Sequence, residues 1–308
     1  MINNIYIDQE LKNKMEISKK SRIKRFGKRL VISTATNCFP AISITGTFCE
    51  LNCKHCRGKL LNTLLSAKDE SRLENIAYSL VKKNAKGILL TGGCDRNGKV
   101  PIINFSKSIK KIKSTTDLIV IAHTGIGCIN EEEALQLKDS GLDGIAFDVV
   151  GAKQTIKNIY GLDIEVEEYI KTLQNIEKAD IPIFPHICIG LDHGILKGEF
   201  NALQLLKNIN PKVIILTGLM PITNTPLRHK KPNPLDFVRV ITYADKEFSE
   251  TPIVLGCARS YGSDRELIDI LSIESGINGI AIPTQKAVDW AVKAGYEIKI
   301  GIPCLFRC

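Results

Sequence analysis

The chain has 308 residues, 44% hydrophobic content and a net charge of +9. This length suits one large α/β barrel, and apolar runs of about eight residues are too short to cross a bilayer. The first residues lack the apolar core and cleavage site of a secretory signal, so we expect a cytoplasmic protein without membrane contact. In a reducing compartment its ten cysteines indicate metal binding or redox chemistry rather than structural disulfides.

Eight continuous apolar runs, rich in β-branched residues, alternate with eight amphipathic stretches. Continuous apolar runs are typical of parallel strands that are buried on both faces. The predicted strands are residues 41–45, 87–91, 118–122, 144–148, 183–188, 213–217, 253–256 and 279–282. The predicted helices are residues 70–83, 103–112, 131–139, 166–176, 198–206, 236–247, 264–273 and 285–294.

The repeated strand-then-helix order predicts an α/β fold, a closed (β/α)8 TIM-type barrel. We expect an N-terminal helical extension at residues 1–37, the barrel at 38–295, and a C-terminal extended tail at 296–308 packed on the barrel. In such barrels the chemistry lies at the carboxyl ends of the strands. These ends carry polar and sulfur-bearing side chains, among them Cys49, Cys94, His123, Asp148, His186, Cys257 and Arg259.

A basic run, KKSRIKRFGKR at residues 19–29, contributes much of the positive charge. The first interpretation is a solvated face. The alternatives are docking to an acidic protein domain or to nucleic acid. Nucleic acid is the weaker alternative, because no RNA-binding appendage follows the predicted barrel.

The segment TFCELNCKHCRG, residues 47–58, follows the first predicted strand and has C-x3-C-x2-C spacing. Three thiolates on a short loop suit a [4Fe-4S] cluster, which normally takes four. Zinc is the rival metal, but structural zinc sites usually combine two blocks of paired ligands, and no second compact C-x2-C pair exists. With three ligands, one iron stays open to a small molecule that carries an amine and a carboxylate.

This motif after the first strand of a barrel resembles the radical S-adenosylmethionine (SAM) enzymes. The resemblance implies that a SAM-binding [4Fe-4S] cluster is held by Cys49, Cys53 and Cys56. His55 would then pack against the SAM adenine. Gly92 and Gly93 match the Gly-Gly-Glu motif of that family, with Cys94 in place of the glutamate. Further SAM contacts are implied for His123, Asp148, Ile189 and Gly190.

By the same resemblance, the cluster reduces SAM to methionine and a 5′-deoxyadenosyl radical, which abstracts hydrogen from an unactivated carbon. The segments 221–227, 235–244 and 253–259 resemble biotin synthase and lipoyl synthase. Those enzymes insert sulfur at unactivated C–H bonds and sacrifice a second iron–sulfur cluster. Motifs at 92–101, 147–151, 185–191 and 256–259 resemble the smaller component of the archaeal-type two-protein lipoyl synthase.

The ligands of a second cluster are less clear in the sequence. Arg259 takes the place of an arginine that holds this cluster in biotin synthase, which makes it a candidate catalytic residue. Cys94, Cys128 and Cys188 are out of register with the cysteine ligands of that enzyme, and a shift along a strand can turn a side chain to the other face.

The extended tail offers another set of ligands. Ten residues of extended chain reach about 30 Å, which is enough to bring the tail cysteines to the barrel mouth. We therefore expect an auxiliary iron–sulfur cluster held by some of Cys94, Cys257, Cys304 and Cys308, with Cys38 in reserve. The alternatives are buried or tail thiols without a cluster, and a [2Fe-2S] site of the biotin synthase type.

The expected function is radical SAM sulfur insertion into an octanoyl chain in lipoyl cofactor biosynthesis. The expected partners are an octanoylated lipoyl-carrier domain, a second radical SAM subunit, and an electron donor such as a ferredoxin or flavodoxin. One alternative is a biotin synthase or another radical SAM enzyme of small molecules. The other is an iron–sulfur scaffold subunit with a vestigial SAM site.

Overall fold

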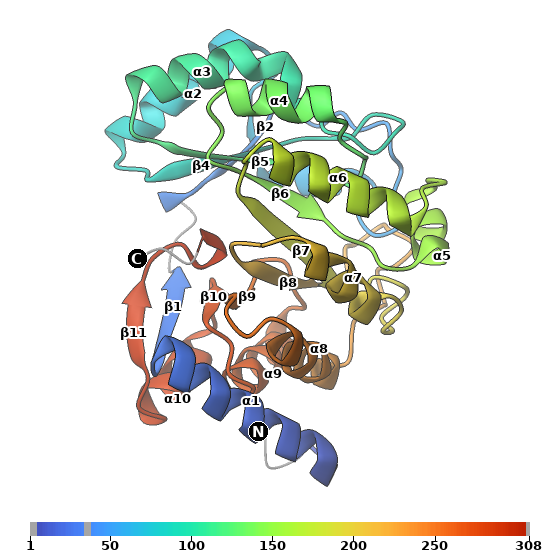
Figure 1. Cartoon of the computed structure of the whole chain (residues 1–308), viewed down its shortest axis with the longest axis vertical. Coiled ribbons are helices and arrows are strands. Elements are labelled where there is room, and N and C mark those ends of the chain that lie inside the picture. The colour runs from blue at the N-terminus through green and yellow to red at the C-terminus, as the bar shows by residue number, and fades with distance from the viewer. Residues whose placement is uncertain (1–4, 34–37, 306–308) are drawn as a thin grey trace.

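A parallel sheet of eleven strands, curved into a half-barrel, forms the centre of the protein (Figure 1). The structure is a computed structural model, and it describes residues 5–33 and 38–305. The strands lie in the order β11-β1-β10-β9-β8-β7-β6-β5-β4-β2-β3. Their bounds are β1 Arg29–Ser33, β2 Ala41–Ser43, β3 Leu65–Ser66, β4 Gly87–Thr91, β5 Ile119–His123, β6 Gly144–Asp148, β7 Ile183–Ile189, β8 Ile214–Gly218, β9 Ile253–Leu255, β10 Gly279–Ala281 and β11 Glu297–Ile300.

Helices cover the outer face of this sheet (Figure 1). Their starts follow local signals: the Asp69 carboxylate accepts from the Arg72 amide at the start of α2, and Asn130 and Glu133 form a capping box on α4. The α-helices are α1 Gln9–Phe26, α2 Glu70–Lys82, α3 Ser106–Thr115, α4 Glu131–Asp139, α5 Lys153–Thr155, α6 Val166–Lys178, α7 Glu199–Leu205, α8 Pro234–Glu247, α9 Gly262–Glu274 and α10 Gln285–Lys293. The shorter helical turns are η3 Lys59–Thr63, η4 Ile102–Phe105, η5 Ile156–Tyr160, η6 Leu206–Asn208 and η7 Pro303–Leu305.

The α/β fold class and the order of the eight predicted strands are confirmed. Closure of the barrel is a correction, because the sheet is open, with β3 and β11 at its edges. The reason is β1, a strand that the sequence pattern did not reveal. It pairs with β10 through Val31 and Gly279, and so occupies the edge that β2 would need to close the barrel. The division at residues 37 and 295 stays a prediction.

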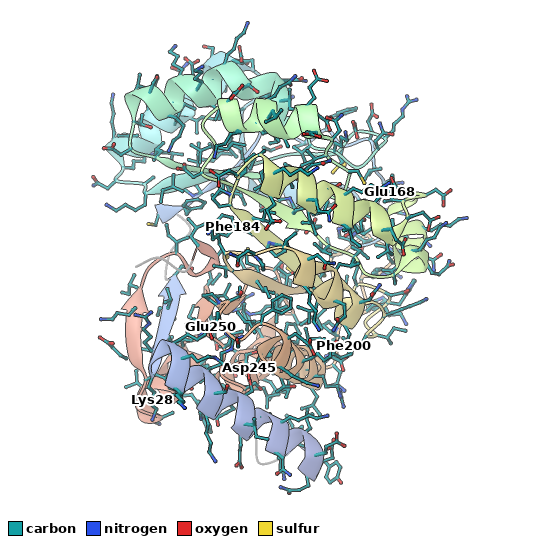
Figure 2. All side chains as sticks on the ribbon, viewed as in Figure 1. Lys28, Glu168, Phe184, Phe200, Asp245 and Glu250 are labelled. Atoms are coloured by element: carbon teal, nitrogen blue, oxygen red, sulfur yellow. The ribbon has the colours of Figure 1, made fainter. Side chains whose placement is uncertain are left out.

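Side chains on the concave face of the sheet form a second, inner apolar group. It contains Phe184, which Figure 2 labels, together with Ile121 and Val254. The tail enters this interior: β11 runs parallel to β1, and the turn η7 after it packs Cys304 and Leu305 against the inner group. The extended tail is thus present, and Cys304 points inward from it. Cys308 lies outside the described residues.

Helix α1 packs across the amino ends of the last strands. The Ser18 hydroxyl donates to the Ser275 carbonyl (2.8 Å), and Arg22 donates to the carbonyl of Thr251 (2.7 Å), just before β9. Arg22 and Arg25 both pair with Asp245 of α8, which Figure 2 labels. Burial lowers the pKa of Arg22 to about 10, although Asp245 opposes the shift. The basic run is therefore partly an anchor and only partly a solvated face.

No helix in residues 5–33 and 38–305 is both long enough and apolar enough to span a membrane.

Candidate functional site

The three-cysteine loop begins where β2 ends and lies against the end of β4. The Glu50 amide donates to the Cys94 carbonyl (2.8 Å), and the Lys54 amide donates to the Ile159 carbonyl (2.8 Å). The loop then turns back through Arg57, a left-handed residue with φ of 48°. Backbone bonds to two distant segments therefore fix the loop without using its thiols.

The thiols of this loop are neighbours. Cys53 is buried, and Cys49 and Cys56 are half-buried. Cys53 donates to Cys56, and this bond, with help from His55, lowers the pKa of Cys56 to about 4 and raises that of Cys53. One thiolate thus forms readily in the metal-free loop, and thiolates are the form that binds metal.

His55 packs beside this thiol group. Its ring meets the Tyr160 ring edge-on at 5.2 Å between centroids, and its Nδ1 is buried without a hydrogen-bond partner. Burial works to lower the pKa of His55, but the bond to Cys56 outweighs it and raises the pKa. Burial raises the pKa of Tyr160 well above its usual range. An orphaned ring nitrogen next to three thiols is what a missing polar ligand would leave.

Gly92 and Gly93 lie directly under the cysteine loop. A Cβ on Gly93 would come within 1.9 Å of the Phe48 carbonyl oxygen and 2.6 Å of the Cys49 Cα, so no other residue fits there. The Gly93 amide donates to Thr45 Oγ1 (2.6 Å), and this hydroxyl donates to the Phe48 carbonyl (2.9 Å). In the part of the chain described, no donor reaches the Gly92 and Gly93 carbonyls, which remain acceptors for a bound amine.

Asp148 and two histidines form a polar group at the ends of β5, β6 and β7. His123 Nε2 lies 3.4 Å from Asp148 Oδ1, and the His123 and His186 rings meet edge-on at 5.3 Å. Burial works against charge on both partners, yet their mutual attraction lowers the pKa of Asp148 and raises that of His123. Burial and the neighbouring His123 lower the pKa of His186 to about 4. The Asp148 carboxylate therefore favours the protonated form of His123, whereas burial favours the neutral form of His186.

Ile189 and Gly190, at the end of β7, were predicted to contact SAM, and only Gly190 offers a surface for such a contact. The Ile189 side chain is fully buried in the core under the helices, and its carbonyl accepts from the Leu219 amide (3.0 Å). Gly190 has φ of 70°, and its amide donates to Glu199 (2.8 Å). Contact with a ligand at this point would therefore come from the backbone turn at Gly190.

The cysteines expected to hold an auxiliary cluster fall into two places. Cys94 belongs to the first thiol group: burial, and then Cys49 and Asp148, raise its pKa to about 12. Cys304 lies near Cys257 instead. Burial and then Cys257 raise the pKa of Cys304 to about 12, while Arg259 opposes the shift. Cys94 thus lies with the first thiol group, whereas Cys304 lies on the side of the half-barrel that carries Cys257 and Arg259.

Arg259 is fully buried and heavily bonded. Its Nε donates to Asp269 of α9 (2.7 Å), and its other nitrogens donate to the carbonyls of Gly256 (2.5 Å), Ala281 (3.0 Å) and Ile282 (3.2 Å). Asp269 is also fully buried and accepts from the Thr284 amide (2.9 Å). Arg259 thus ties the ends of β9 and β10 to α9. A role as a cluster ligand stays a prediction.

Two residues in this site escaped the sequence reasoning. Tyr160 ends the π-helical turn η5, and such turns are frequent at functional sites, yet nothing in the sequence marks one. Thr45 joins the cysteine loop to Gly93 through one hydroxyl. Only the three-dimensional contact between two distant segments reveals this function.

The donor set fits a [4Fe-4S] cluster with SAM. Three neighbouring thiols, a buried ring nitrogen without a partner and two carbonyls without a donor lie around the cysteine loop. No group of three His, Cys, Asp or Glu side chains in residues 5–33 and 38–305 is already arranged around a single ion. The nine described cysteines are free thiols. The assignment of individual ligands stays a prediction.

Comparisons with known proteins agree with this site. The sequence model of the radical SAM superfamily matches residues 43–196. Biotin synthase of Coxiella burnetii (strain Dugway 5J108-111) is 27% identical over 237 residues, which cover 71% of this chain and 69% of that protein. Biotin synthase of Neorickettsia sennetsu is 29% identical over 164 residues, half of this chain and 47% of that protein.

Solved structures show the same fold. Methylornithine synthase (PylB) has a TM-score of 0.69 at 13% identity, covering 98% of this chain and 92% of that one. HydG, a maturase of the [FeFe]-hydrogenase, has a TM-score of 0.71 at 16% identity, covering 98% of this chain and 71% of that one. At these identities the likeness concerns the fold alone.

Proposed function

Because the chain belongs to the radical SAM superfamily, we propose that it inserts sulfur into an octanoyl chain carried on a lysine of a lipoyl-carrier domain. The observation that supports this most is the presence of two separate thiol groups. One is the loop of Cys49, Cys53 and Cys56, and the other is the pair Cys257 and Cys304. Sulfur insertion needs both a source of the radical and a source of sulfur.

The first group would hold the SAM-binding cluster. When bound, this cluster and SAM supply a 5′-deoxyadenosyl radical that removes hydrogen from an unactivated carbon. The residues of this chain would orient the cofactor: the Gly92 and Gly93 carbonyls, which have no donor among the described residues, would accept from its amine, and His55, whose Nδ1 is unpaired, would pack on its adenine. His123 and Asp148, whose side chains lie 3.4 Å apart, would hold the ribose hydroxyls.

The second group would hold the auxiliary cluster. Cys257 is exposed after β9, and Cys304 packs from the tail against the inner apolar group on the same side of the half-barrel. Cys308, four residues further on, is the third proposed ligand. We assign Cys94 to the first group, because its carbonyl accepts from the Glu50 amide of the cysteine loop.

The remaining partners of this proposal are a second radical SAM subunit and an electron donor such as a ferredoxin or flavodoxin. A donor is required by the chemistry, because reductive cleavage of SAM consumes an electron. A second subunit would account for one of the two sulfur insertions.

A biotin synthase is the second candidate function. It is favoured by the curated relatives, which carry that name at 27% and 29% identity. The two candidates differ in substrate and not in the first step. Activity on dethiobiotin, or a [2Fe-2S] absorption signature, would support this candidate over the first.

The test is turnover of an octanoyl-lysyl peptide by anaerobically reconstituted protein, with and without a second radical SAM subunit. The proposal expects 5′-deoxyadenosine together with a thiolated peptide, both detected by mass spectrometry. Formation of 5′-deoxyadenosine with dethiobiotin, and none above background with the peptide in either arrangement, would contradict it. Absence of SAM cleavage in cluster-replete protein would instead support a scaffold with a vestigial SAM site.

A further inference from the structure

The two ends of the half-barrel carry positive charge in different ways. On α1, at the amino end, acidic neighbours neutralise much of the basic run: Arg22 and Arg25 pair with Asp245, and Lys19 pairs with Glu274 (2.9 Å). This end is also opposite the carboxyl ends of the strands, where the thiols lie, since α1 contacts the turns that lead into β9 and β10. A carrier docked there could not present its arm to the site.

The carboxyl end carries unpaired charge. The segment 219–233 between β8 and α8 contains RHKK at residues 228–231 and no aspartate or glutamate. Arg228 and Lys230 are exposed, as are Lys54 and Arg57 of the cysteine loop. Among the described residues none of these four has an acidic partner, whereas Lys231 pairs with Asp264 (2.5 Å).

These two basic segments form one continuous rim. Lys59, which follows the cysteine loop, donates to the Thr223 carbonyl (3.0 Å). The turn after β7 packs on the same segment, because a Cβ on Gly194 would lie 2.5 Å from the Lys231 carbonyl oxygen. Tyr261, after β9, donates to the Met220 sulfur (3.5 Å). Segments that are distant in the sequence thus contact residues 219–233 at the mouth.

The rim also exposes large apolar side chains. Phe48 is 66% exposed, Tyr261 60%, Ile195 58% and Leu60 37%. All four come from segments that follow strands β2, β7 or β9, and so lie on the same end as the basic residues. Exposed aromatic side chains among basic ones are typical of protein interfaces, where the aromatics supply most of the affinity.

We propose that this rim is the docking surface for an acidic carrier domain, which presents its acylated lysine to the mouth. This inference rests on the proposed function and adds the surface that recognises the carrier. Charge complementarity favours an acidic partner, and the exposed apolar residues favour a folded domain over a polyanion. The basic run on α1 is not part of this surface.

The test compares two variants with equal change of charge. Arg228→Glu with Lys230→Glu reverses the rim, and Lys12→Glu with Lys24→Glu reverses exposed positions on α1. Binding of an octanoylated lipoyl-carrier domain of net negative charge is measured with the reconstituted protein at low and moderate salt. We expect the rim variant to lose tenfold or more in affinity, with a weaker salt dependence, and the α1 variant to bind as the wild type.

A short octanoyl-lysyl peptide, which lacks the domain, separates docking from chemistry. The rim variant is expected to turn over the peptide like the wild type. Equal loss of carrier affinity in both variants, or no loss in the rim variant, would overturn the docking inference alone. Failure of the wild type to bind the carrier overturns it as well. Failure of the wild type to use the peptide, with dethiobiotin accepted, would overturn the proposed function instead.

Discussion

The two thiol groups differ in how the fold assembles them. Cys49, Cys53 and Cys56 lie within eight residues on one loop, which backbone bonds to the Cys94 and Ile159 carbonyls hold in place. Cys257 follows a strand and Cys304 lies in the tail, which enters the half-barrel because β11 adds to the edge of the sheet and η7 turns inward. Sequence proximity therefore brings together the three thiols of the loop, the local group, whereas the placement of Cys304 relative to Cys257 depends on how the tail packs on the half-barrel.

The largest effect is expected from the local group. Cys56→Ala removes one of three ligands, and the remaining two cannot hold a [4Fe-4S] cluster stably. Reductive SAM cleavage should fall to background, and about four irons per chain should be lost from the reconstituted protein. Cys128→Ala, which removes a cysteine outside both groups, is the control and should change neither quantity.

Arg259→Ala tests the structure around Cys257 and Cys304, because Arg259 ties the ends of β9 and β10 to α9. Since the buried pair with Asp269 would lose one partner, the metal-free protein should lose about 3–5 kcal/mol of unfolding free energy in urea. Arg265→Ala, half-buried and bonded to the same Ile282 carbonyl (2.9 Å), should cost less. A metal-free Arg259→Ala protein of wild-type stability that fails only to assemble auxiliary iron would mean that Arg259 serves as a ligand.

Gly93→Ala tests whether the local group depends on its backing strand. The added Cβ overlaps the Phe48 carbonyl and the Cys49 backbone, and overpacking of this kind costs about 1–3 kcal/mol. Gly93→Ala should also assemble less cluster, which is measured by the absorbance of the reconstituted protein near 400 nm. Gly92→Ala is the milder comparison, because the nearest atoms to its Cβ would be the Thr45 side-chain atoms at 3.0 Å and 3.1 Å rather than backbone. Equal effects at both positions would contradict this packing.

The smallest effect concerns the charges of Asp148, His123 and His186. NMR titration of metal-free protein should place the pKa of His186 at about 4 and that of His123 above its usual value. Asp148→Asn should lower the pKa of His123, since the carboxylate is what raises it. A His123 pKa unmoved by Asp148→Asn would contradict the ion pair.

These shifts also fix the sign of the pH dependence. The raised pKa of His123 gives stability that is present below its usual value and is lost as the pH rises through the folded-state value. The lowered pKa of His186 does the opposite. Its neutral form is favoured by folding, so stability is lost as the pH falls from about 6.5 towards 4.

Sequence reasoning predicted what short-range patterns encode. The eight strands follow from continuous apolar runs, and the three-cysteine loop from its spacing, because both signals lie within a few residues. Gly93 could be singled out by its motif. The Phe48 carbonyl, which excludes a side chain at that position, could not be predicted from the sequence. Thr45 and Tyr160 gave no signal, because their contacts join segments far apart in the chain.

The long-range predictions fared unevenly for the same reason. The tail was correctly expected to be extended, since β11 is a strand, whereas the meeting of Cys304 with Cys257 stays a prediction. Closure of the barrel was wrong, because β1 lies in a stretch whose apolar run is short and preceded by basic residues. Arg259 was singled out by its position, yet its bonds to Asp269 and three carbonyls could not be read from the sequence.

The central claim is that one chain carries two clusters with separate ligands. The direct measurement is the iron and sulfide content, with Mössbauer spectra, of anaerobically reconstituted wild type and of the double variant Cys257→Ala with Cys304→Ala. We expect about eight irons in the wild type and about four in the double variant, which should retain reductive SAM cleavage. About four irons in both proteins, with identical spectra, would contradict the claim.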